Sequence, residues 1–167
     1  MKVFLIGFMG SGKSTYGKKL ANQLGYEHVD VDSLFEEQTG KTISEWFEHE
    51  GEDSFRAMET ELLRSLGDKD NIVISTGGGA ACFNENIDWM NENGFTVYLK
   101  LLEPQLLKRL KKGQEERPLI ADLTEKELAL FIHSMLNERS KYYAQAQLVI
   151  QPEQFQPKLL AEYLKAL

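Results

Sequence analysis

The chain has 167 residues, of which 42% are hydrophobic and 27% charged, and its formal net charge is −7 at pH 7. This composition is typical of a soluble globular protein, and no apolar stretch approaches the roughly 20 residues that a membrane helix needs. The acidic balance argues against nucleic acid as a partner, because binding a phosphate backbone requires a broad basic surface. We expect one domain over residues 1–167, acting as a monomer, with no membrane partner.

The cysteine content and the start of the sequence predict a cytoplasmic protein. Cys82 is the single cysteine and can form no internal disulfide, which fits a reducing compartment. The first apolar run leads directly into a glycine-rich stretch at residues 7–15, so a cleavable signal peptide would remove that stretch.

Short β-rich runs alternate with helical patterns along the chain. The runs are KVFLIG (residues 2–7), YEHVDVD (26–32), NIVIST (71–76), FTVYLKL (95–101) and AQLVIQ (146–151). This alternation predicts an α/β fold, with a five-stranded parallel sheet flanked by helices on both faces. Ligand sites in such folds lie at the carboxyl ends of the strands.

The stretch GFMGSGKST at residues 7–15 matches the phosphate-loop pattern G-x-x-x-x-G-K-[ST], with a strand-like run before it and a helical pattern after it. Lys13 would reach the β- and γ-phosphates of a nucleoside triphosphate, and the Ser14 hydroxyl would bind Mg²⁺. A simple turn from strand to helix explains neither side chain. The residues expected to contact the nucleotide are Gly10, Ser11, Gly12, Lys13, Ser14 and Thr15.

The loop motif leaves the fate of the γ-phosphate open. The sequence lacks the guanine-reading Asn-Lys-x-Asp pattern of a switch GTPase, and 167 residues are few for a motor or transporter ATPase. A small-molecule kinase that uses ATP and Mg²⁺ is therefore the leading interpretation.

Asp30 and Asp32 close the second strand-like run. A spacing of two places both side chains on one face of a strand, at the end where the phosphate loop also lies. One carboxylate can then support Mg²⁺ through water while the other accepts a hydroxyl proton. The competing interpretation makes Asp32 the N-cap of a helix that begins at Ser33.

The stretch EDSFRAMETELL at residues 52–63 has the apolar spacing of a helix. Arg56 and Glu59 lie three positions apart on another side of that helix, so Glu59 is placed to hold the guanidinium. A surface ion pair explains the same spacing, and the segment alone does not decide between the two.

The stretch STGGGA at residues 75–80 follows the third strand-like run. Three consecutive glycines, Gly77, Gly78 and Gly79, cost backbone entropy, which favours a place where a ligand approaches the main chain closely. The alternative is a plain flexible turn.

Residues 108–127 interrupt the helical periodicity with charge, Gly113 and Pro118. We expect a mobile lid over about residues 110–123, in which Arg117 can clamp the charge of a transferring phosphate. Arg139, in the helical pattern that follows, offers a fork-shaped donor for a planar carboxylate.

Taken together, these motifs resemble those of the shikimate kinase family over nearly the whole chain. They are the phosphate loop, VDVDS, the G-E-x-x-F-R-x-x-E pattern, the triple glycine, RPLI at residues 117–120 and ERSKYYAQA at residues 138–146. The resemblance implies a P-loop kinase of the nucleoside-monophosphate-kinase-like group, with a mobile lid. It also implies phosphorylation of the 3-hydroxyl of shikimate by ATP, in the pathway to chorismate and the aromatic amino acids.

The resemblance implies a role for each matching residue on the donor side. Lys13 contacts the transferred phosphate, Ser14 with Asp30 binds Mg²⁺, and Arg117 matches the lid arginine. The first basic residue of the lid is either Arg109 or Lys111, so the adenine contact on that side stays open.

On the acceptor side, Asp32 matches the aspartate that contacts the ring hydroxyls and activates the one that is phosphorylated. Arg56 and Arg139 match the pair that holds the substrate carboxylate, and residues 77–79 match the glycine run beside the substrate. The chain departs from the family pattern R-x-P-x-Y, because Lys141 replaces the proline.

Two other functions stay open. One is a gluconate-like or nucleotide kinase on the same fold, which the combination of D-x-D, F-R and triple glycine disfavours. The other is a silent domain that binds shikimate or nucleotide and regulates a partner, which the intact Lys13, Asp32 and Arg56 disfavour.

Overall fold

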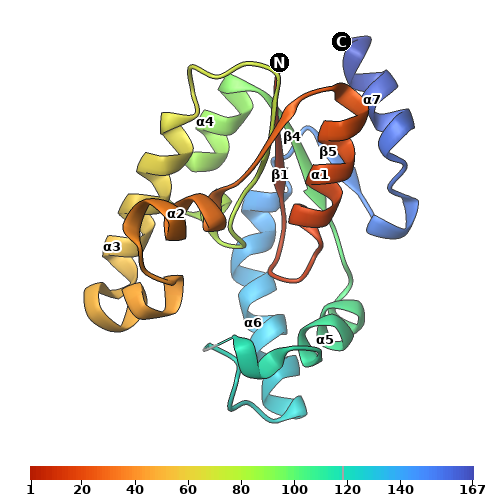
Figure 1. Ribbon diagram of the computed structural model, residues 1–167. Helices are drawn as coiled ribbons and strands as arrows, with labels where there is room; N and C mark the ends of the chain where they lie inside the picture. The colour runs from red at the N-terminus through yellow and green to blue at the C-terminus, as the bar shows by residue number, and fades with distance from the viewer. Residues whose placement is uncertain (118) are drawn as a thin grey trace.

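Figure 1 shows a computed structural model of the protein, which describes residues 1–117 and 119–167. The strands are β1 (Lys2–Ile6), β2 (Glu27–Asp30), β3 (Ile72–Ser75), β4 (Phe95–Leu99) and β5 (Leu148–Ile150). The helices are α1 (Lys13–Leu24), α2 (Val31–Thr39), α3 (Ile43–Ser65), α4 (Asn86–Asn93), α5 (Glu103–Lys111), α6 (Glu125–Tyr143) and α7 (Pro157–Lys165). Short 3₁₀ turns are η1 (Ala80–Cys82), η2 (Gln114–Glu116) and η3 (Pro152–Gln154).

The five strands form one parallel sheet in the order β2-β3-β1-β4-β5. Each lies within a strand-like run of the sequence, so the predicted sheet is confirmed. The chain passes from β1 to one side of the sheet, through β2 and β3, and then crosses to β4 on the other side. The strand order therefore reverses at β1, and ligands bind in open α/β sheets at the carboxyl end of such a switch point.

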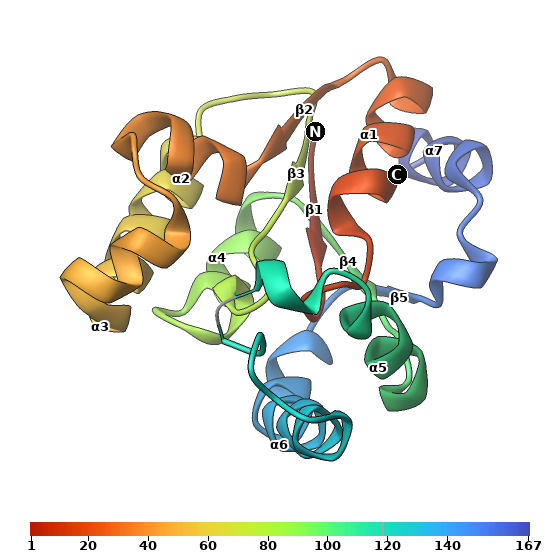
Figure 2. The same cartoon turned by 60° about the horizontal axis from the view of Figure 1, so that its bottom comes forward.

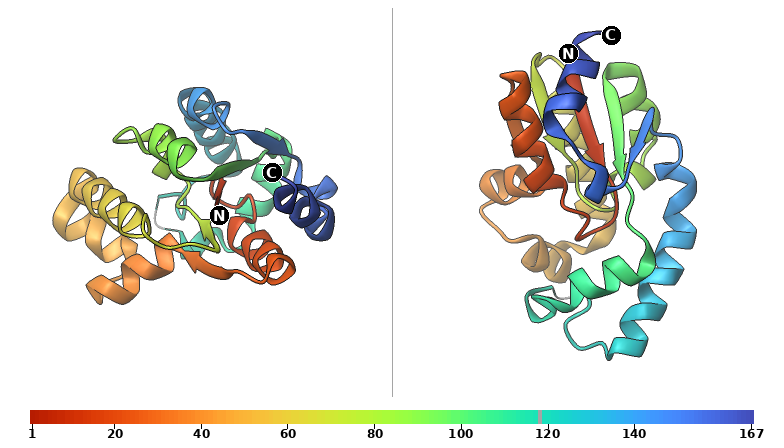
Figure 3. Two further views of the ribbon diagram at one scale, coloured as in Figure 1. Left: turned by 90° about the horizontal axis from the view of Figure 1, so that it is seen from above. Right: turned by 90° about the vertical axis from the view of Figure 1, so that its right-hand side faces the viewer.

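Both faces of the sheet are buried. Side chains alternate between the two faces along each strand, and helices cover each face. Val3 and Leu5 belong to a core cluster shared with α1 and α7. Phe4 and Ile6 belong to a second cluster that includes residues of α3, α4 and α6. Figure 3 shows α1 and α7 on one side of the sheet and α4 and α6 on the other. The two layers hold the strand ends at one fixed edge.

The end of β2 differs from the prediction. The strand stops at Asp30, whose carboxylate accepts hydrogen bonds from the backbone N–H groups of Asp32 (3.1 Å) and Ser33 (3.2 Å). Asp30 is thus the N-cap of α2, and Asp32 lies in the first helical turn. The expectation that both aspartates end a strand is wrong, and so is the alternative that Asp32 is the cap. Asp30 takes the cap because its extended backbone points its carboxylate at the free N–H groups.

The predicted helix at residues 52–63 lies within α3. This helix begins with a capping box formed by Thr42 and Glu45, and it bends at Gly51, whose φ of 82° and ψ of 174° are not helical. A side chain is strained at such a φ, so glycine suits the bend. The bend separates the first turns of α3 from the part that carries Arg56.

An irregular segment joins α5 to α6, where the sequence predicts a break over about residues 110–123, but residues 110 and 111 belong to α5. Pro118 within the segment lies outside the described residues. The Gln114 side chain donates to the carbonyl oxygens of Ile120 and Leu123, each at 2.7 Å, and Ile120 is fully buried. We call residues 110–123 the lid segment. Figure 2 brings it forward, across the end of the sheet where β1 stops. Among the described helices, none is both long and apolar enough to cross a membrane.

Candidate active site

The phosphate loop follows β1 and leads into α1. The Lys13 ammonium group donates to the carbonyl oxygens of Gly7 (2.8 Å) and Phe8 (2.9 Å). An ammonium has three donors, so this anchoring leaves a proton for a phosphate oxygen. Burial lowers the pKa of Lys13 to about 8, although the charges of Asp32 and Asp30 oppose the shift. Burial disfavours the charged form of Lys13, and the negative charge of a bound phosphate would stabilise that form.

A cavity of about 380 Å³ opens over this loop, and we call it the phosphate-loop cavity. Its lining residues are Met9, Gly10, Gly12, Lys13, Ser14, Thr15, Asp30, Asp32, Thr76, Gly78 and Arg117. Ser11, which belongs to the phosphate loop, is fully buried and is not among the residues that line this cavity. The Arg109 guanidinium donates to the Gly10 carbonyl (3.3 Å), whereas Lys111 pairs with Glu125 (2.8 Å). Of the two candidate basic residues, Arg109 is therefore the one beside the phosphate loop.

The donor atoms for a divalent cation lie at one edge of the phosphate-loop cavity. The Ser14 hydroxyl donates to the Asp30 carboxylate, and both residues line the cavity. The described part of the chain holds no group of three or more His, Cys, Asp or Glu side chains able to bind a metal alone. Mg²⁺ in kinase sites typically uses one or two protein ligands together with phosphates and water, so this pair fits it.

A second cavity of about 460 Å³ adjoins the first, and we call it the acceptor cavity. Its lining residues are Met9, Asp32, Ile43, Ser44, Phe47, Glu48, Glu116, Arg117 and Leu119. Met9, Asp32 and Arg117 line both cavities. A group transferred from one cavity to the other would therefore pass beside the Asp32 carboxylate and the Arg117 side chain.

Asp32 has a perturbed acidity. Burial raises the pKa of Asp32 to about 6, with further upward contributions from the charges of Glu59 and Asp30. The positive charges of Lys13 and Arg56 act in the opposite direction. A carboxylate with a pKa close to neutral and a place between two cavities suits proton acceptance.

The Arg56–Glu59 pair is buried, so the surface ion pair considered from the sequence is wrong. Arg56 is 9% exposed and Glu59 is 2% exposed, and one guanidinium nitrogen lies 2.8 Å from Glu59 Oε1. The Phe83 ring lies 4.2 Å from the Arg56 guanidinium carbon. Within the described residues, Glu59 Oε2 has no hydrogen-bond partner, and Arg56 Nε has none either, although it lies 3.6 Å from Glu52 Oε1 in an ion pair. Buried polar atoms are nearly always paired, so Glu59 Oε2 points to a ligand or ordered water.

The triple glycine, which we call the glycine segment (residues 77–79), is crowded by the protein itself. A Cβ atom at Gly77 would lie 2.5 Å from Glu59 Oε2, and one at Gly79 would lie 2.6 Å from an Arg56 guanidinium nitrogen. At Gly78 it would lie 3.0 Å from the Met9 backbone nitrogen. A plain flexible turn does not explain this packing. Side chains are absent here because the backbone passes between charged groups and the phosphate loop.

Arg139 and Arg117 differ in the hydrogen-bond partners of their guanidinium groups. Arg139 lies in α6, is 7% exposed, and has one terminal nitrogen without a hydrogen-bond partner among the described residues. Its charge and that of Arg56 both oppose the upward pKa shift that burial imposes on Glu59, so the three groups interact. The Arg117 guanidinium instead donates to the carbonyl oxygens of Lys112 and Gly113, each at 3.0 Å.

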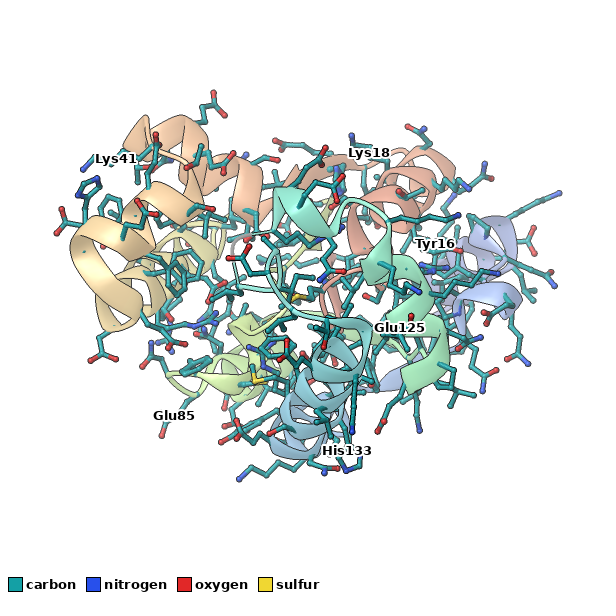
Figure 4. The ribbon with its side chains drawn as sticks, turned by 90° about the horizontal axis from the view of Figure 1, so that it is seen from below. Tyr16, Lys18, Lys41, Glu85, Glu125 and His133 are labelled. Carbon is teal, nitrogen blue, oxygen red and sulfur yellow. The ribbon has the colours of Figure 1, made fainter. Side chains whose placement is uncertain are left out.

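The structure brings all of the predicted site residues to the carboxyl end of the sheet, although not into one cavity. Arg56 and Arg139 do not line the two cavities described above. In Figure 4, which looks at the molecule from below, the labelled Lys41, Glu85 and His133 lie at the periphery, while the lid ribbon crosses the centre.

Sequence reasoning missed several lining residues. Met9 lines both cavities, Thr76 lines the phosphate-loop cavity, and Phe47 and Leu119 line the acceptor cavity. The position of Met9 inside the phosphate loop was a usable signal. Thr76 lies next to the triple glycine, which was also a usable signal. Phe47 and Leu119 have no distinguishing pattern, because an apolar residue at a cavity has the same spacing as one in the core.

A phosphate loop on a sheet ordered β2-β3-β1-β4-β5, with a carboxylate between two cavities, defines a P-loop phosphotransferase. The model of the family described as shikimate kinase matches residues 9–167, and the chain belongs to the shikimate kinase family. The family resemblance noted in the sequence is thereby confirmed.

Curated relatives and solved structures agree with this assignment. A shikimate kinase from Azobacteroides pseudotrichonymphae is 42% identical over 149 residues, which cover 89% of this chain and 88% of the relative. A crystal structure of shikimate kinase from Bacteroides thetaiotaomicron has a TM-score of 0.90 at 36% identity, covering 99% of this chain and 97% of that one. The Acinetobacter baumannii shikimate kinase, solved in complex with shikimate, has a TM-score of 0.85 at 33% identity and covers 98% and 90%.

Proposed function

We propose that the protein transfers the γ-phosphate of ATP to the 3-hydroxyl of shikimate, giving ADP and shikimate 3-phosphate. The observation that carries this proposal is the meeting of two cavities at Asp32 and Arg117. One cavity lies over the phosphate loop, and the other adjoins it beside Asp32. Arg56 and Arg139, the candidate partners of a carboxylate, are buried next to these cavities rather than in their lining. Membership of the shikimate kinase family supports this choice of acceptor.

On the donor side, the backbone N–H groups of residues 10–15 and the N-terminus of α1 hold the phosphates. Lys13 contacts the β- and γ-phosphates, which compensates for the burial of its ammonium group. Ser14 and Asp30 would hold Mg²⁺, which would neutralise charge on the phosphate oxygens. Arg117 leaves its lid carbonyls and stabilises the charge on the transferred group.

On the acceptor side, Arg56 and Arg139 bind the substrate carboxylate, and the glycine segment lies against the ring. Asp32 accepts the proton of the attacking substrate hydroxyl while the oxygen of that hydroxyl forms a bond to the γ-phosphorus. The bond between that phosphorus and the oxygen bridging to the β-phosphate breaks, and ADP leaves. Because phosphoryl transfer depends mainly on positioning and charge, holding both substrates matters more than base strength.

A coupled ADP-release assay with purified protein tests this function. Shikimate should stimulate ADP release in the presence of ATP and Mg²⁺, and ³¹P coupling in the product should place the phosphate on the 3-hydroxyl. Gluconate and nucleoside monophosphates serve as competing acceptors. ADP release that ignores shikimate, or prefers either competitor, would overturn the proposal. Turnover of shikimate would also exclude a silent regulatory domain.

We further propose that the protein works as a monomer, because both faces of its sheet are covered by its own helices. Its single cysteine, Cys82, supports a reducing, cytoplasmic location. Light scattering during size exclusion should give the mass of one chain, 19.1 kDa. A dimer mass at assay concentration would contradict the monomer.

A further inference from the structure

Tyr143 is a buried side chain that the scheme above does not use. It is the last residue of α6 and is 0% exposed. Its ring stacks on Tyr98 of β4, with centroids 5.0 Å apart and an interplanar angle of 25°. Its hydroxyl donates a hydrogen bond to the carbonyl oxygen of Gly78. Because a buried phenol needs a partner, this bond defines where the ring and the glycine segment meet.

The bond to Tyr143 ties the glycine segment to a distant element. Two other carbonyls of the segment, those of Gly77 and Gly79, accept from the backbone of Ala80 (3.2 Å) and Cys82 (2.9 Å). Those bonds are local to η1, whereas Tyr143 lies 65 positions along the chain from Gly78. The local bonds determine the shape of the turn, and the bond from Tyr143 fixes the position of the turn relative to α6.

The same helix carries Arg139, a residue predicted to bind the carboxylate of the acceptor substrate. Arg139 lies four residues before Tyr143, so the two side chains share one face of α6. Both are buried, and α6 also contacts η1, which follows the glycine segment. A displacement of the glycine segment would therefore change its position relative to the Arg139 guanidinium.

We propose that Tyr143 is a positioning residue for the acceptor substrate. Through Gly78 it fixes the glycine segment at a set distance from Arg139, so that the substrate ring meets the backbone while its carboxylate meets the guanidinium. This inference rests on the proposed function, because it places shikimate beside the glycine segment. Tyr143 itself touches no reacting atom.

The substitution Tyr143→Phe removes the hydroxyl and retains the ring that stacks on Tyr98. Loss of one neutral hydrogen bond should raise the KM for shikimate about three- to tenfold. The KM for ATP should rise less than the KM for shikimate, because the Tyr143 hydroxyl bonds to Gly78 and acts on the phosphate loop indirectly, through the packing of Gly78 against Met9. Tyr142→Phe is the matched control: it removes a hydroxyl from the neighbouring, half-buried tyrosine of the same helix.

Two results would overturn the inference. One is a Tyr143→Phe enzyme whose shikimate KM equals that of the parent. The other is an equal rise in both KM values accompanied by a lower melting temperature, which would indicate a purely structural role.

Hydrogen exchange provides a readout that does not depend on turnover. The amides of residues 77–82 should exchange faster in Tyr143→Phe than in Tyr142→Phe. Unchanged exchange there contradicts the inference even if the parent turns out to use another acceptor. Conversely, a parent that ignores shikimate while exchange accelerates in Tyr143→Phe would reject the proposed function and retain the anchoring of the glycine segment.

Discussion

At the scale of single residues, Asp32 and Asp30 have separable roles although they are two positions apart. Asp30 caps α2 and contacts Ser14, whereas Asp32 lies between the two cavities and accepts none of the capping bonds. Asparagine caps a helix about as well as aspartate, but it cannot accept a proton or carry charge to a cation. Paired Asp→Asn substitutions therefore distinguish proton acceptance from metal support.

We predict that Asp32→Asn lowers kcat by a factor on the order of 10² to 10⁴, the usual contribution of a positioned general base. ATP binding should survive, because Lys13, Ser14 and the loop amides are untouched. Steady-state kinetics and nucleotide titration measure both effects. Asp30→Asn, the control, should keep the cap and instead raise the Mg²⁺ concentration needed for half-maximal rate. Near-parent turnover in Asp32→Asn would exclude the base.

The pH dependence of kcat/KM is a second prediction at this scale. Asp32, with a pKa of about 6, must be ionised to accept a proton, so activity should fall below that pH. Lys13, with a pKa of about 8, must be protonated to bind phosphate, so activity should also fall above that pH. The plot of kcat/KM against pH should be bell-shaped. Its two apparent pKa values describe Asp32 and Lys13 together, because the two groups interact. The acid limb should disappear in Asp32→Asn, and its persistence would assign it to another group.

The raised pKa of Asp32 also affects stability. The carboxyl group binds its proton more tightly in the folded protein, at about 6, than at its ordinary value of 3.8. Its contribution to the free energy of unfolding is therefore full below pH 3.8 and is lost as the pH rises through about 6. Asp32→Asn removes this buried charge, so it should not lower the melting temperature at pH 7.

Arg56 tests carboxylate recognition. Arg56→Lys keeps the charge and loses the planar fork that pairs with a carboxylate. The KM for shikimate should rise by at least about tenfold, in line with the loss of a charge-assisted hydrogen bond, while ATP affinity stays near the parent value. Arg64→Lys is a suitable control, because Arg64 lies on the same helix but lines neither cavity, and its guanidinium contacts the exposed Asn84 carbonyl and the Trp89 ring. An unchanged shikimate KM in Arg56→Lys would remove Arg56 from the substrate site.

At the scale of elements, the lid segment has to rearrange before it can act. Arg117 is held by the carbonyls of Lys112 and Gly113, and Gln114 ties the segment to itself. These bonds are exposed or only partly buried, which favours local opening, whereas the fully buried Ile120 provides an anchor. Closure of such a segment excludes water from the phosphoryl group.

We predict that hydrogen exchange across residues 110–123 slows when a non-hydrolysable ATP analogue and shikimate are both present. Each ligand alone should give a smaller effect, since Arg117 lines both cavities. Residues 157–165 of α7, remote from the cavities, provide the internal reference. Equal exchange with and without ligands would argue against a closing lid.

At the scale of the whole molecule, the sheet unites the chain. Two core clusters lie on opposite faces of the same five strands, and both include residues of β1, β3 and β4. Removing either helical layer would expose one face of strands whose other face supports the second layer, so each layer depends on the same strands staying folded. The expected consequence is cooperative unfolding of residues 1–167 as one unit.

Calorimetry should show a single transition whose van't Hoff and calorimetric enthalpies agree. ATP analogue and shikimate together should raise its midpoint, because a ligand that binds only the folded state stabilises it, each one by about 2.7 kcal/mol at 100 times its Kd. Two separated transitions, one of them insensitive to ligand, would contradict a single domain.

Local patterns in the sequence were sufficient for the strands, the phosphate loop and the identity of the charged site residues. Hydrophobic periodicity and the spacing of glycine, lysine and serine depend on neighbours along the chain, so they can be read without the fold. The arginines could also be identified, because residues 51–59 and 138–146 carry their own motifs. The continuous course of α6 through Lys141 required the structure, since a family pattern with proline at that position indicates a local turn.

The tertiary structure alone decided which side chains are buried and what they meet. It assigned the cap to Asp30, buried the Arg56–Glu59 pair, and joined Tyr143 to Gly78. Each of these depends on contacts between segments far apart in sequence, or on the exact residue at which a strand gives way to a helix. Desolvation by that packing raises the pKa of Asp32, and no spacing along the chain measures desolvation.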